Sequence, residues 1–263
     1  MARFSVVKIG GNVLNQPELL DIFLRQFESL SGPKLLVHGG GALASQLAKR
    51  LGIPVEMKEG RRITDQQMLD VVVMTYGGLV NKQIVAKLQS IDVNAMGLTG
   101  ADGNVLLAKR RPLTKDIDYG WVGDPIQADT ELLLSWMNDG VVPVIAPLTH
   151  DGQGSLLNTN ADTIAQFLAV ALSAEVEVSL TYTFELAGVL RDMGREDTLL
   201  RTMRHSEYQS LRKAGVIHSG MIPKLDNAFF ALEGGVHSVN LMKYDRVDRL
   251  NQEGFDAYTR LLK

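Results

Sequence analysis

Short apolar runs alternate along the chain with segments whose apolar residues recur at the spacing of a helix. Residues 3–9 are predicted to form a buried strand, and residues 18–30 show helical periodicity. Residues 34–37 are the next predicted strand, followed by a helix that begins near Leu43 and ends at Gly52. This β-α-β-α order predicts an α/β fold with a mainly parallel sheet and helices on its faces.

The rest of the chain continues the same alternation. Strands are predicted over residues 93–98, 141–147, 176–182 and 236–242, and helices over residues 130–137, 163–172, 206–214 and 225–233. Residues 105–109 and 118–124 are predicted to form an antiparallel hairpin or flap. No repeat or low-complexity linker is present, and we expect two closely packed lobes, residues 1–172 and residues 173–263.

A long predicted helix, residues 65–88, carries apolar residues on more than one side. Thr64 and Asp65 have the side chains of a helix N-cap. A helix that is apolar on several sides needs cover on several sides, so the pattern favours contact with a second subunit and hence a homodimer. The alternative is a central helix that its own chain buries.

Two predicted strands end in glycine clusters, Lys8-Ile9-Gly10-Gly11 and His38-Gly39-Gly40-Gly41. Glycines let main-chain N–H groups approach an anion closely, a helix N-terminus favours negative charge, and Lys8 adds a full positive charge. A single cluster of this kind is also typical of an ordinary strand-turn-helix junction. Because a strand that ends in a glycine cluster occurs twice, we predict two anion-binding loops.

Two further polar clusters lie near predicted strands. Residues 55–64 are rich in charge and include Arg62, and the common fate of such a run is a solvated hairpin. Asn158, Asn160 and Asp162 lie at a strand-to-helix boundary. Asn160 or Asp162 alone would cap the helix, so the excess of polar side chains indicates a ligand site at the carboxyl edge of the sheet.

The composition limits the classes of function. The chain has 263 residues, of which 45% are hydrophobic, and its net charge of −3 comes from mixed signs, so no basic face for nucleic acid is expected. The absence of cysteine excludes disulfides, thiolate metal sites and a cysteine nucleophile. No apolar run approaches the ~18 residues of a membrane span, and the N-terminus lacks a signal peptide's layout. We therefore expect a cytoplasmic enzyme without a nucleic-acid or membrane partner.

Five motifs, taken in order, resemble the amino acid kinase family over residues 5 to about 242, and within it the acylglutamate kinases. They are Lys8-Ile9-Gly10-Gly11, His38-Gly39-Gly40-Gly41, Gly60-Arg61-Arg62-Ile63-Thr64, Asn158-Thr159-Asn160-Ala161-Asp162 and Gly220-Met221-Ile222-Pro223-Lys224. Neither the Gly-x-Gly-x-x-Gly fingerprint of a Rossmann fold nor a P-loop is present. The resemblance implies a three-layer αβα sandwich around an open, mainly parallel sheet.

The activity implied by the resemblance is transfer of the ATP γ-phosphoryl group to the side-chain carboxylate of an N-acylated glutamate, in arginine biosynthesis. The acyl group, acetyl or succinyl, stays open. A glutamate side chain with a pKa near 4.3 is already ionised at neutral pH, so no general base is required. Catalysis should rest on positioning and on positive charge around the transferred group, with Lys8 and Lys224 on the phosphoryl group and Asp162 holding both ammonium groups.

The resemblance also assigns the binding residues. The acceptor is expected on Gly40, Gly41, Arg62 and Asn158, with Asn160 in support, and Arg62 gripping the α-carboxylate as a planar fork. Amides of Gly10, Gly11 and Gly40 are expected to cradle phosphoryl oxygens. ATP is expected on the second lobe, with Mg²⁺ bound through the phosphates. The corresponding residues of that lobe are Glu185, Leu186, Gly188, Val216, Ile217 and His218.

The chain departs from the family pattern in three places. Phe184-Glu185 replaces the usual Thr-Asp or Ser-Asp, and the terminal strand with Gly-Thr is missing, so we expect the last sheet edge to be trimmed or differently covered. Only seven residues precede Lys8, which leaves no room for the N-terminal helix of arginine-inhibited hexamers. We therefore expect a dimer that arginine does not inhibit.

Other functions stay open. Within the family, an aspartate, UMP or carbamate kinase is the alternative, and the Gly60-Arg61-Arg62-Ile63-Thr64 motif favours an acylated glutamate. The altered second lobe also fits a sensor that binds the amino acid without phosphoryl transfer. The presence of Lys8, Lys224 and Asp162 favours an enzyme, because a binding module needs no charge at the phosphoryl position.

Overall fold

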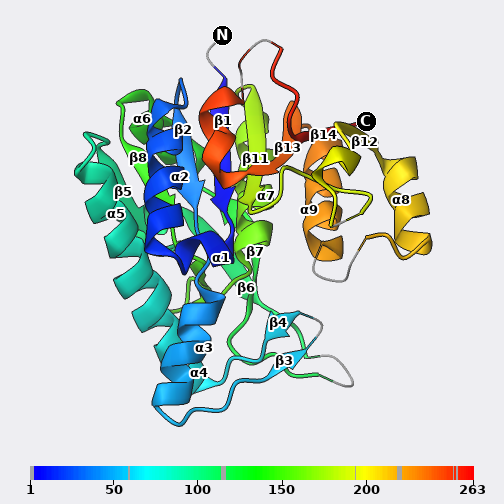
Figure 1. Cartoon of the computed structure of the whole chain (residues 1–263). Helices are drawn as coiled ribbons and strands as arrows, with labels where there is room; N and C mark the ends of the chain where they lie inside the picture. Colours follow the sequence, from blue (N-terminus) through cyan, green and yellow to red (C-terminus); the bar gives the residue numbers. More distant parts are fainter. Residues whose placement is uncertain are drawn as a thin grey trace. The chain divides into compact units, whose positions relative to one another are not determined.

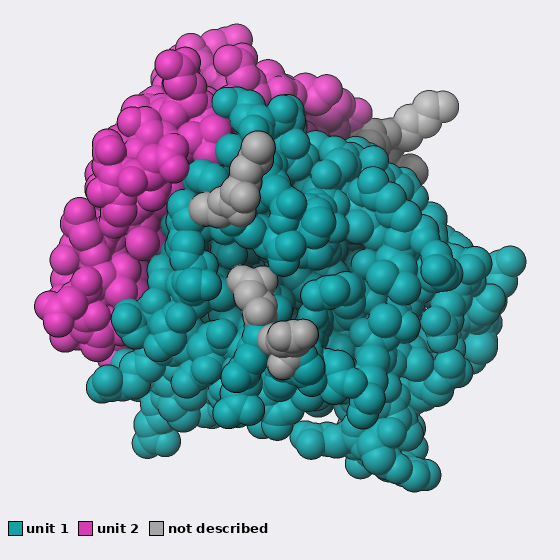
Figure 2. Space-filling view, turned by 90° about the horizontal axis from the view of Figure 1, so that it is seen from above, with its two compact units in different colours: residues 1–34, 165–263 teal, residues 35–164 magenta. Residues whose placement is uncertain are grey.

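The computed structural model describes residues 3–58, 60–113, 117–192, 194–217, 221–250, 252 and 254–263. The chain forms two compact units: unit 1 is residues 1–34 with 165–263, and unit 2 is residues 35–164 (Figure 2). The predicted boundary at residue 172 lies near one of the crossings between them. The first 34 residues, however, group with the C-terminal half, because the first strand pairs in parallel with a strand that begins at Val178.

Unit 1 is built on strands in the spatial order β12-β14-β13-β11-β1. Their bounds are β1 (Phe4–Ile9), β11 (Val178–Phe184), β12 (Thr202–Arg204), β13 (Ser238–Lys243) and β14 (Thr259–Leu262). β1, β11 and β13 run parallel, and every residue of β1 and β11 is buried. Continuous burial is typical of parallel strands covered on both faces, so the predicted α/β class is confirmed here.

Helices alternate with these strands along the chain (Figure 1). They are α1 (Gly11–Leu14), α2 (Pro17–Ser29), most of α7 (Ala161–Ser173), α8 (His205–Lys213) and α9 (Ile222–Glu233), with 3-10 turns at Glu196–Thr198 and Tyr244–Arg249. α2 buries Phe23 and Phe27 and packs against the 3-10 turn at Tyr244–Arg249. α9 packs against β13 and β14 and carries Lys224 in its first turn.

The end of the chain forms a strand, so the prediction of a missing terminal strand is wrong. β14 pairs antiparallel with β13 and parallel with β12. Thr259 and Leu261 are buried while Arg260 is exposed, which is the period-two pattern of a strand with one covered face. The Thr259 hydroxyl donates to the carbonyl of Leu200 at 2.6 Å and accepts from the amide of Val189 at 2.8 Å. This hydroxyl fastens the turn after β11 to the sheet without the expected glycine.

Unit 2 combines parallel strands with a smaller, mainly antiparallel sheet. The parallel strands lie in the order β2 (Lys34–Val37), β8 (Val142–Ile145) and β5 (Ala95–Leu98). The smaller sheet has the order β10 (Leu156–Asn158), β9 (Leu148–His150), β6 (Leu106–Arg110) and β7 (Gly123–Ala128). β6 and β7 pair antiparallel, which confirms the predicted excursion. A two-stranded hairpin, β3 (Met57–Lys58) and β4 (Arg61–Arg62), completes the strands.

The predicted long helix of unit 2 is confirmed, but its middle is not α-helical. It consists of α4 (Gln66–Val72), a π-helix over Val73–Val80 and α5 (Asn81–Gln89), which follow one another without interruption in Figure 1. Asp65 is the N-cap, as predicted, and its carboxylate accepts from the amide of Met68 at 2.8 Å. The other helices of unit 2 are α3 (Gly41–Arg50) and α6 (Thr130–Asn138), with a 3-10 turn at Asp102–Asn104.

Candidate active site

The first glycine turn joins a strand to a helix, as its sequence predicts. Gly10 ends β1 and forms the N-cap of α1 with extended backbone angles, so its requirement for glycine is not conformational. A Cβ atom at Gly10 would lie 2.8 Å from the carbonyl oxygen of Thr183. The neighbouring strand therefore leaves no room for a side chain, while Gly11 has open space around its Cα. Phosphate binding by these amides stays a prediction.

The two predicted catalytic lysines of unit 1 approach the same residue. Lys8 is buried in β1 and is the register partner of Tyr182 in β11, so their side chains share one face of the sheet. The Lys224 ammonium lies 5.4 Å from the centre of the Tyr182 ring, within the range of a cation–π contact. Tyr182 is fully buried. The sequence analysis did not select it, because a tyrosine in a buried strand cannot be distinguished from other core residues by sequence alone.

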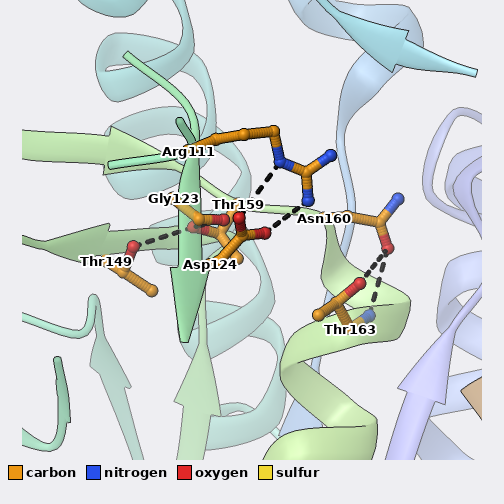
Figure 3. A network of polar contacts seen from close by, with 7 residues as sticks. All are labelled: Arg111, Gly123, Asp124, Thr149, Thr159, Asn160 and Thr163. Atoms are coloured by element: carbon orange, nitrogen blue, oxygen red, sulfur yellow. Dashed lines mark hydrogen bonds and ion pairs between the residues drawn. The ribbon is translucent and has the colours of Figure 1, made fainter. Parts of the chain in front are cut away.

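The helix that follows Asn158-Thr159-Asn160-Ala161-Asp162 is capped by Asn160. The Asn160 Oδ1 accepts from the backbone amide of Asp162 at 2.9 Å and from that of Thr163 at 3.1 Å. Figure 3 shows the contact with Thr163. The oxygen of Asn160 therefore caps the helix, and its supporting role in acceptor binding stays a prediction. Asp162, the second residue of α7, is not the cap, so capping does not explain its carboxylate. Asp162 belongs to unit 2, and its predicted contact with both ammonium groups stays a prediction.

Thr159 has a structural role in the same segment. Its hydroxyl lies 2.8 Å from the hydroxyl of Thr149 and donates to the carbonyl of Gly123 at 3.3 Å (Figure 3). The side chains of Asp124, beside Gly123, and Arg111 form an ion pair. These contacts fix the chain just before the helix that carries Asp162.

Arg62 is buried, whereas the other described residues of its hairpin, residues 57–58 and 60–61, are partly or fully exposed, as expected for a solvated hairpin. Its exposed fraction is 7%, against 51% for Met57. The Arg62 Nη2 donates to the carbonyl of Gly41 at 2.9 Å and to the hydroxyl of Ser45 at 2.8 Å. Among the residues that the structure describes, no Asp or Glu forms an ion pair with this guanidinium. Burial of an unpaired charge is costly, so this guanidinium is poised to bind an anion.

The second glycine loop contacts this guanidinium. Gly40, the N-cap of α3, has a φ of 150°, a value that side chains rarely allow. A Cβ atom there would also lie 2.8 Å from the Cδ1 atom of Tyr76. Gly41 begins α3 and offers its carbonyl to Arg62. Gly40, Gly41 and Arg62, all predicted acceptor residues, therefore lie together in unit 2.

Asn158 is joined to Arg62 through Thr64, which the sequence analysis treated only as a cap. The Asn158 Nδ2 donates to the Thr64 hydroxyl at 2.9 Å, and that hydroxyl donates to the carbonyl of Arg62 at 3.0 Å. The backbone of Gly120 and Trp121 runs between the two: Trp121 donates to the carbonyl of Thr64 at 2.7 Å and accepts from Asn158 at 2.9 Å. A Cβ atom at Gly120 would lie 2.1 Å from the carbonyl oxygen of Thr64, so this glycine is the one feature of the sequence that could have indicated the close approach.

His38 fixes the start of the second glycine loop from inside the core. Its Nδ1 lies 2.7 Å from the carbonyl of Gly39, and its Nε2 lies 3.1 Å from the Nδ2 of Asn81. Asn81 Nδ2 also donates to the carbonyl of Val144 at 2.9 Å. Since a carbonyl only accepts and an amide nitrogen only donates, His38 carries its proton on Nδ1. Complete burial lowers the pKa of His38 to about 4, against the opposing effect of its bond to Gly39.

The predicted ATP residues lie in two segments of unit 1. A Cβ atom at Gly188 would lie 2.4 Å from the Thr259 hydroxyl, so close packing in the turn after β11 explains this glycine. Glu185 and Leu186 precede it and are half-buried. Val216 and Ile217 follow α8, and Ile217 is buried. His218 lies outside the described residues, and nucleotide binding by this set stays a prediction.

A comparison with protein families matches the amino acid kinase family over residues 3–242. The chain belongs to the amino acid kinase family. The motifs that carried the resemblance lie within this range, so the family prediction is confirmed.

Relatives within the amino acid kinase family are similar over almost the whole chain. The acetylglutamate kinase of Cytophaga hutchinsonii is 49% identical over 262 residues, which are 100% of this chain and 99% of that protein. The acetylglutamate kinase of Bacteroides fragilis is 52% identical over 237 residues, 90% of each chain. That of Methanopyrus kandleri is 40% identical over 234 residues, 88% of this chain and 91% of that protein.

Solved structures agree on the amino acid kinase fold. The N-acetylglutamate synthase of Neisseria gonorrhoeae, complexed with coenzyme A and N-acetyl-glutamate, has a TM-score of 0.83 at 27% identity over 99% of this chain. This chain spans 59% of the synthase's length. Carbamate kinase of Giardia lamblia bound to AMP-PNP has a TM-score of 0.72, covering 100% of this chain and 99% of that chain, and at 14% identity the likeness concerns the fold. Within the described ranges, no helix has the length and apolar character that a membrane span requires.

Proposed function

We propose that this amino acid kinase transfers the γ-phosphoryl group of ATP to the side-chain carboxylate of N-acetyl-L-glutamate, giving an acyl phosphate. The observation that carries the proposal is the buried guanidinium of Arg62, which bonds to the carbonyl of Gly41, while the backbone carbonyl of Arg62 is linked through Thr64 to Asn158. Such a group suits a small acceptor with a carboxylate. The full-length similarity to acetylglutamate kinases supports the same substrate and favours arginine biosynthesis as its context.

The donor count of Arg62 supports a forked contact. A guanidinium has five N–H groups, and two oxygen acceptors, Gly41 and Ser45, take those of Nη2. Nη1 lies 3.8 Å from the sulfur of Met68, a weak acceptor. Apart from the neighbouring Tyr76 hydroxyl, the N–H groups of Nε and Nη1 have no other oxygen acceptor among the described residues, so they supply one edge of the guanidinium for the α-carboxylate of the acceptor.

Catalysis then needs charge more than proton transfer. The attacking carboxylate is ionised at neutral pH, so the chain need not provide a base. Lys8 and Lys224, which share Tyr182 as a neighbour, would offset the negative charge of the transferred phosphoryl group, and Asp162 would hold their ammonium groups. Mg²⁺ would neutralise the nucleotide phosphates, and the described residues contain no cluster of His, Asp or Glu fit to hold it in a protein cage.

A matched pair of arginine variants tests this site. Arg62→Ala is expected to raise the KM for N-acetylglutamate about ten- to a hundredfold, because a charge-assisted hydrogen bond is worth about 1.5–3 kcal/mol. Arg61→Ala, on the same strand but partly exposed, is the control and should leave this KM unchanged. Hydroxamate formed from the acyl phosphate measures turnover. An unchanged KM in Arg62→Ala would move the acceptor elsewhere.

A substrate panel separates the alternatives. N-acetylglutamate, N-succinylglutamate, aspartate, UMP and carbamate are each offered with ATP and Mg²⁺, and turnover is followed by the release of ADP, because UDP formed from UMP is not an acyl phosphate and gives no hydroxamate. Turnover of an N-acylglutamate alone supports the proposal and identifies the acyl group. Binding of N-acetylglutamate without turnover of any acceptor would identify a sensor instead, and turnover of another acceptor would identify a different kinase.

We also propose a homodimer through the long helix of unit 2. Met74 and Leu79, on its π-helical part, have exposed fractions of 50% and 51%. Met74 also lines a hollow of about 480 Å³, together with apolar residues such as Leu69 and Trp121 and polar ones such as Gln66 and Asp70. A second copy across a two-fold axis would cover this apolar surface. A cytoplasmic location and insensitivity to arginine remain expectations drawn from the sequence.

A further inference from the structure

The π-helix over Val73–Val80 keeps one row of residues on the buried face of the long helix. The row repeats at every fourth residue and consists of Met68, Val72, Tyr76, Val80, Ile84 and Leu88, all buried. In an α-helix of 3.6 residues per turn, each step of four residues rotates the side chain by about 40°, so five steps would turn the row by about 200°. The wider π turns rotate it back. Tyr76 therefore faces the core of unit 2 because of the π conformation.

Tyr76 contacts the backbone of the second glycine loop. Atoms Cδ1 and Cε1 of its ring would lie 2.8 and 3.0 Å from a Cβ atom at Gly40, and Val80, one step along the row, would lie 3.7 Å away. The ring thus covers Gly40 directly, and only 5% of the Tyr76 surface is exposed. A π-helical segment often marks a functional site, and this one aims an aromatic ring at a predicted acceptor residue.

The other end of Tyr76 faces Arg62. Burial raises the pKa of the Tyr76 hydroxyl, and the neighbouring Arg62 guanidinium acts against this effect by its charge and by a polar contact with the hydroxyl. The same guanidinium bonds to the carbonyl of Gly41 at 2.9 Å. Tyr76, Gly40, Gly41 and Arg62 thus form a closed ring of contacts within unit 2.

We propose that Tyr76 is a positioning residue of the acceptor site, which holds the Gly40 backbone with its ring and the Arg62 guanidinium with its hydroxyl. The proposal rests on the function proposed above. By fixing the spacing between the glycine amides and the guanidinium, Tyr76 selects an acceptor whose carboxylates have the separation found in an N-acylated glutamate. A shorter acceptor, such as N-acetylaspartate, does not span that spacing.

Two substitutions separate the contributions of the hydroxyl and the ring. Tyr76→Phe keeps the ring and removes the hydroxyl; we expect it to raise the KM for N-acetylglutamate about three- to tenfold, because the polar contact between this hydroxyl and Arg62 is lost. The kcat and the KM for ATP should stay within about twofold, because the transferred phosphoryl group is not touched. Tyr76→Leu also removes the ring, and we expect a larger KM together with weaker discrimination against N-acetylaspartate. Met74→Leu, exposed on the same π-helix, is the control and should match the wild type.

The discrimination measurement distinguishes positioning from a merely structural role. The ratio of kcat/KM for N-acetylglutamate to that for N-acetylaspartate should fall at least about fivefold in Tyr76→Leu, since the acceptor spacing is no longer held. A general loss of folded protein lowers both values and leaves the ratio unchanged, which would overturn the proposal. An unchanged KM in Tyr76→Phe would overturn the role of the hydroxyl. Wild-type protein that phosphorylates no N-acylglutamate would instead overturn the proposed function.

Discussion

Acidification should destabilise this protein through His38, and the effect can be isolated by one substitution. His38 is completely buried, and both ring nitrogens are bonded in the neutral form, to Gly39 and to Asn81. Protonation would place a second N–H group against the Nδ2 nitrogen of Asn81, which is a donor and cannot accept a hydrogen bond. Burial is the main reason that the pKa of His38 falls to about 4, and Lys82 contributes in the same direction.

The direction and size of the effect follow from this lowered pKa. The folded state binds the His38 proton only near pH 4, whereas the unfolded chain binds it near 6.5, so stability is fully present above pH 6.5 and is lost as the pH falls towards 4. A depression from 6.5 to about 4 corresponds to about 3 kcal/mol when the loss is complete. Between about pH 7.5 and about pH 5, the linkage relation gives a loss of about 2 kcal/mol.

The assay is urea unfolding of the wild type and of His38→Asn at several pH values, followed by the fluorescence of Trp121 and Trp136. Asparagine keeps a donor for the carbonyl of Gly39 and cannot titrate. All other titrating groups are shared, so they cancel when one free energy of unfolding is subtracted from the other. We expect the advantage of the wild type to shrink by about 2 kcal/mol between about pH 7.5 and about pH 5. A difference that does not change with pH would show that His38 is not the group responsible.

The remaining predictions concern charge and assembly. Lys8→Ala and Lys224→Ala should each lower kcat about 10²- to 10³-fold with little change in the acceptor KM, because they remove charge stabilisation of the transition state. Lys58→Ala, at an exposed lysine, is the control. Normal turnover in Lys8→Ala and in Lys224→Ala would refute the mechanism. Light scattering at micromolar concentration should show a homodimer with and without arginine. Met74→Glu should shift it to monomer, and a wild-type monomer or hexamer would contradict the assembly.

Features that depend on local chemistry were predictable from the sequence. The parallel strands β5 and β8 are apolar runs, and the N-cap at Asp65 follows from its side chain alone. In each case the physical requirement belongs to the residue itself or to its immediate neighbours, so one sequence carries it.

Features that depend on a distant neighbour were missed or assigned the wrong role. The terminal strand needs no Gly-Thr pair, because the Thr259 hydroxyl bonds to Val189 and Leu200, far away in the sequence. Asn160 caps α7 with its oxygen, one of the two roles that its position allowed, and its support of the acceptor stays a prediction. The charge run around Arg62, taken alone, favoured a solvated hairpin over a ligand site, and the burial of Arg62 against Gly41 and Ser45 depends on a helix that one sequence does not place beside it.

The long helix shows why periodicity misleads when the helix is not uniform. Its apolar residues were counted on an α-helical wheel, which spreads the four-residue row around the helix and predicts cover on several sides. The π turns over Val73–Val80 gather that row onto one face, so much of the expected apolar circumference is buried inside unit 2. What stays exposed is narrower, chiefly Met74 and Leu79. The surface left for the proposed second subunit is therefore set by the same π turns that direct Tyr76 towards Gly40, and we expect that restoring α-helical geometry would disturb both the proposed subunit contact and the predicted acceptor site.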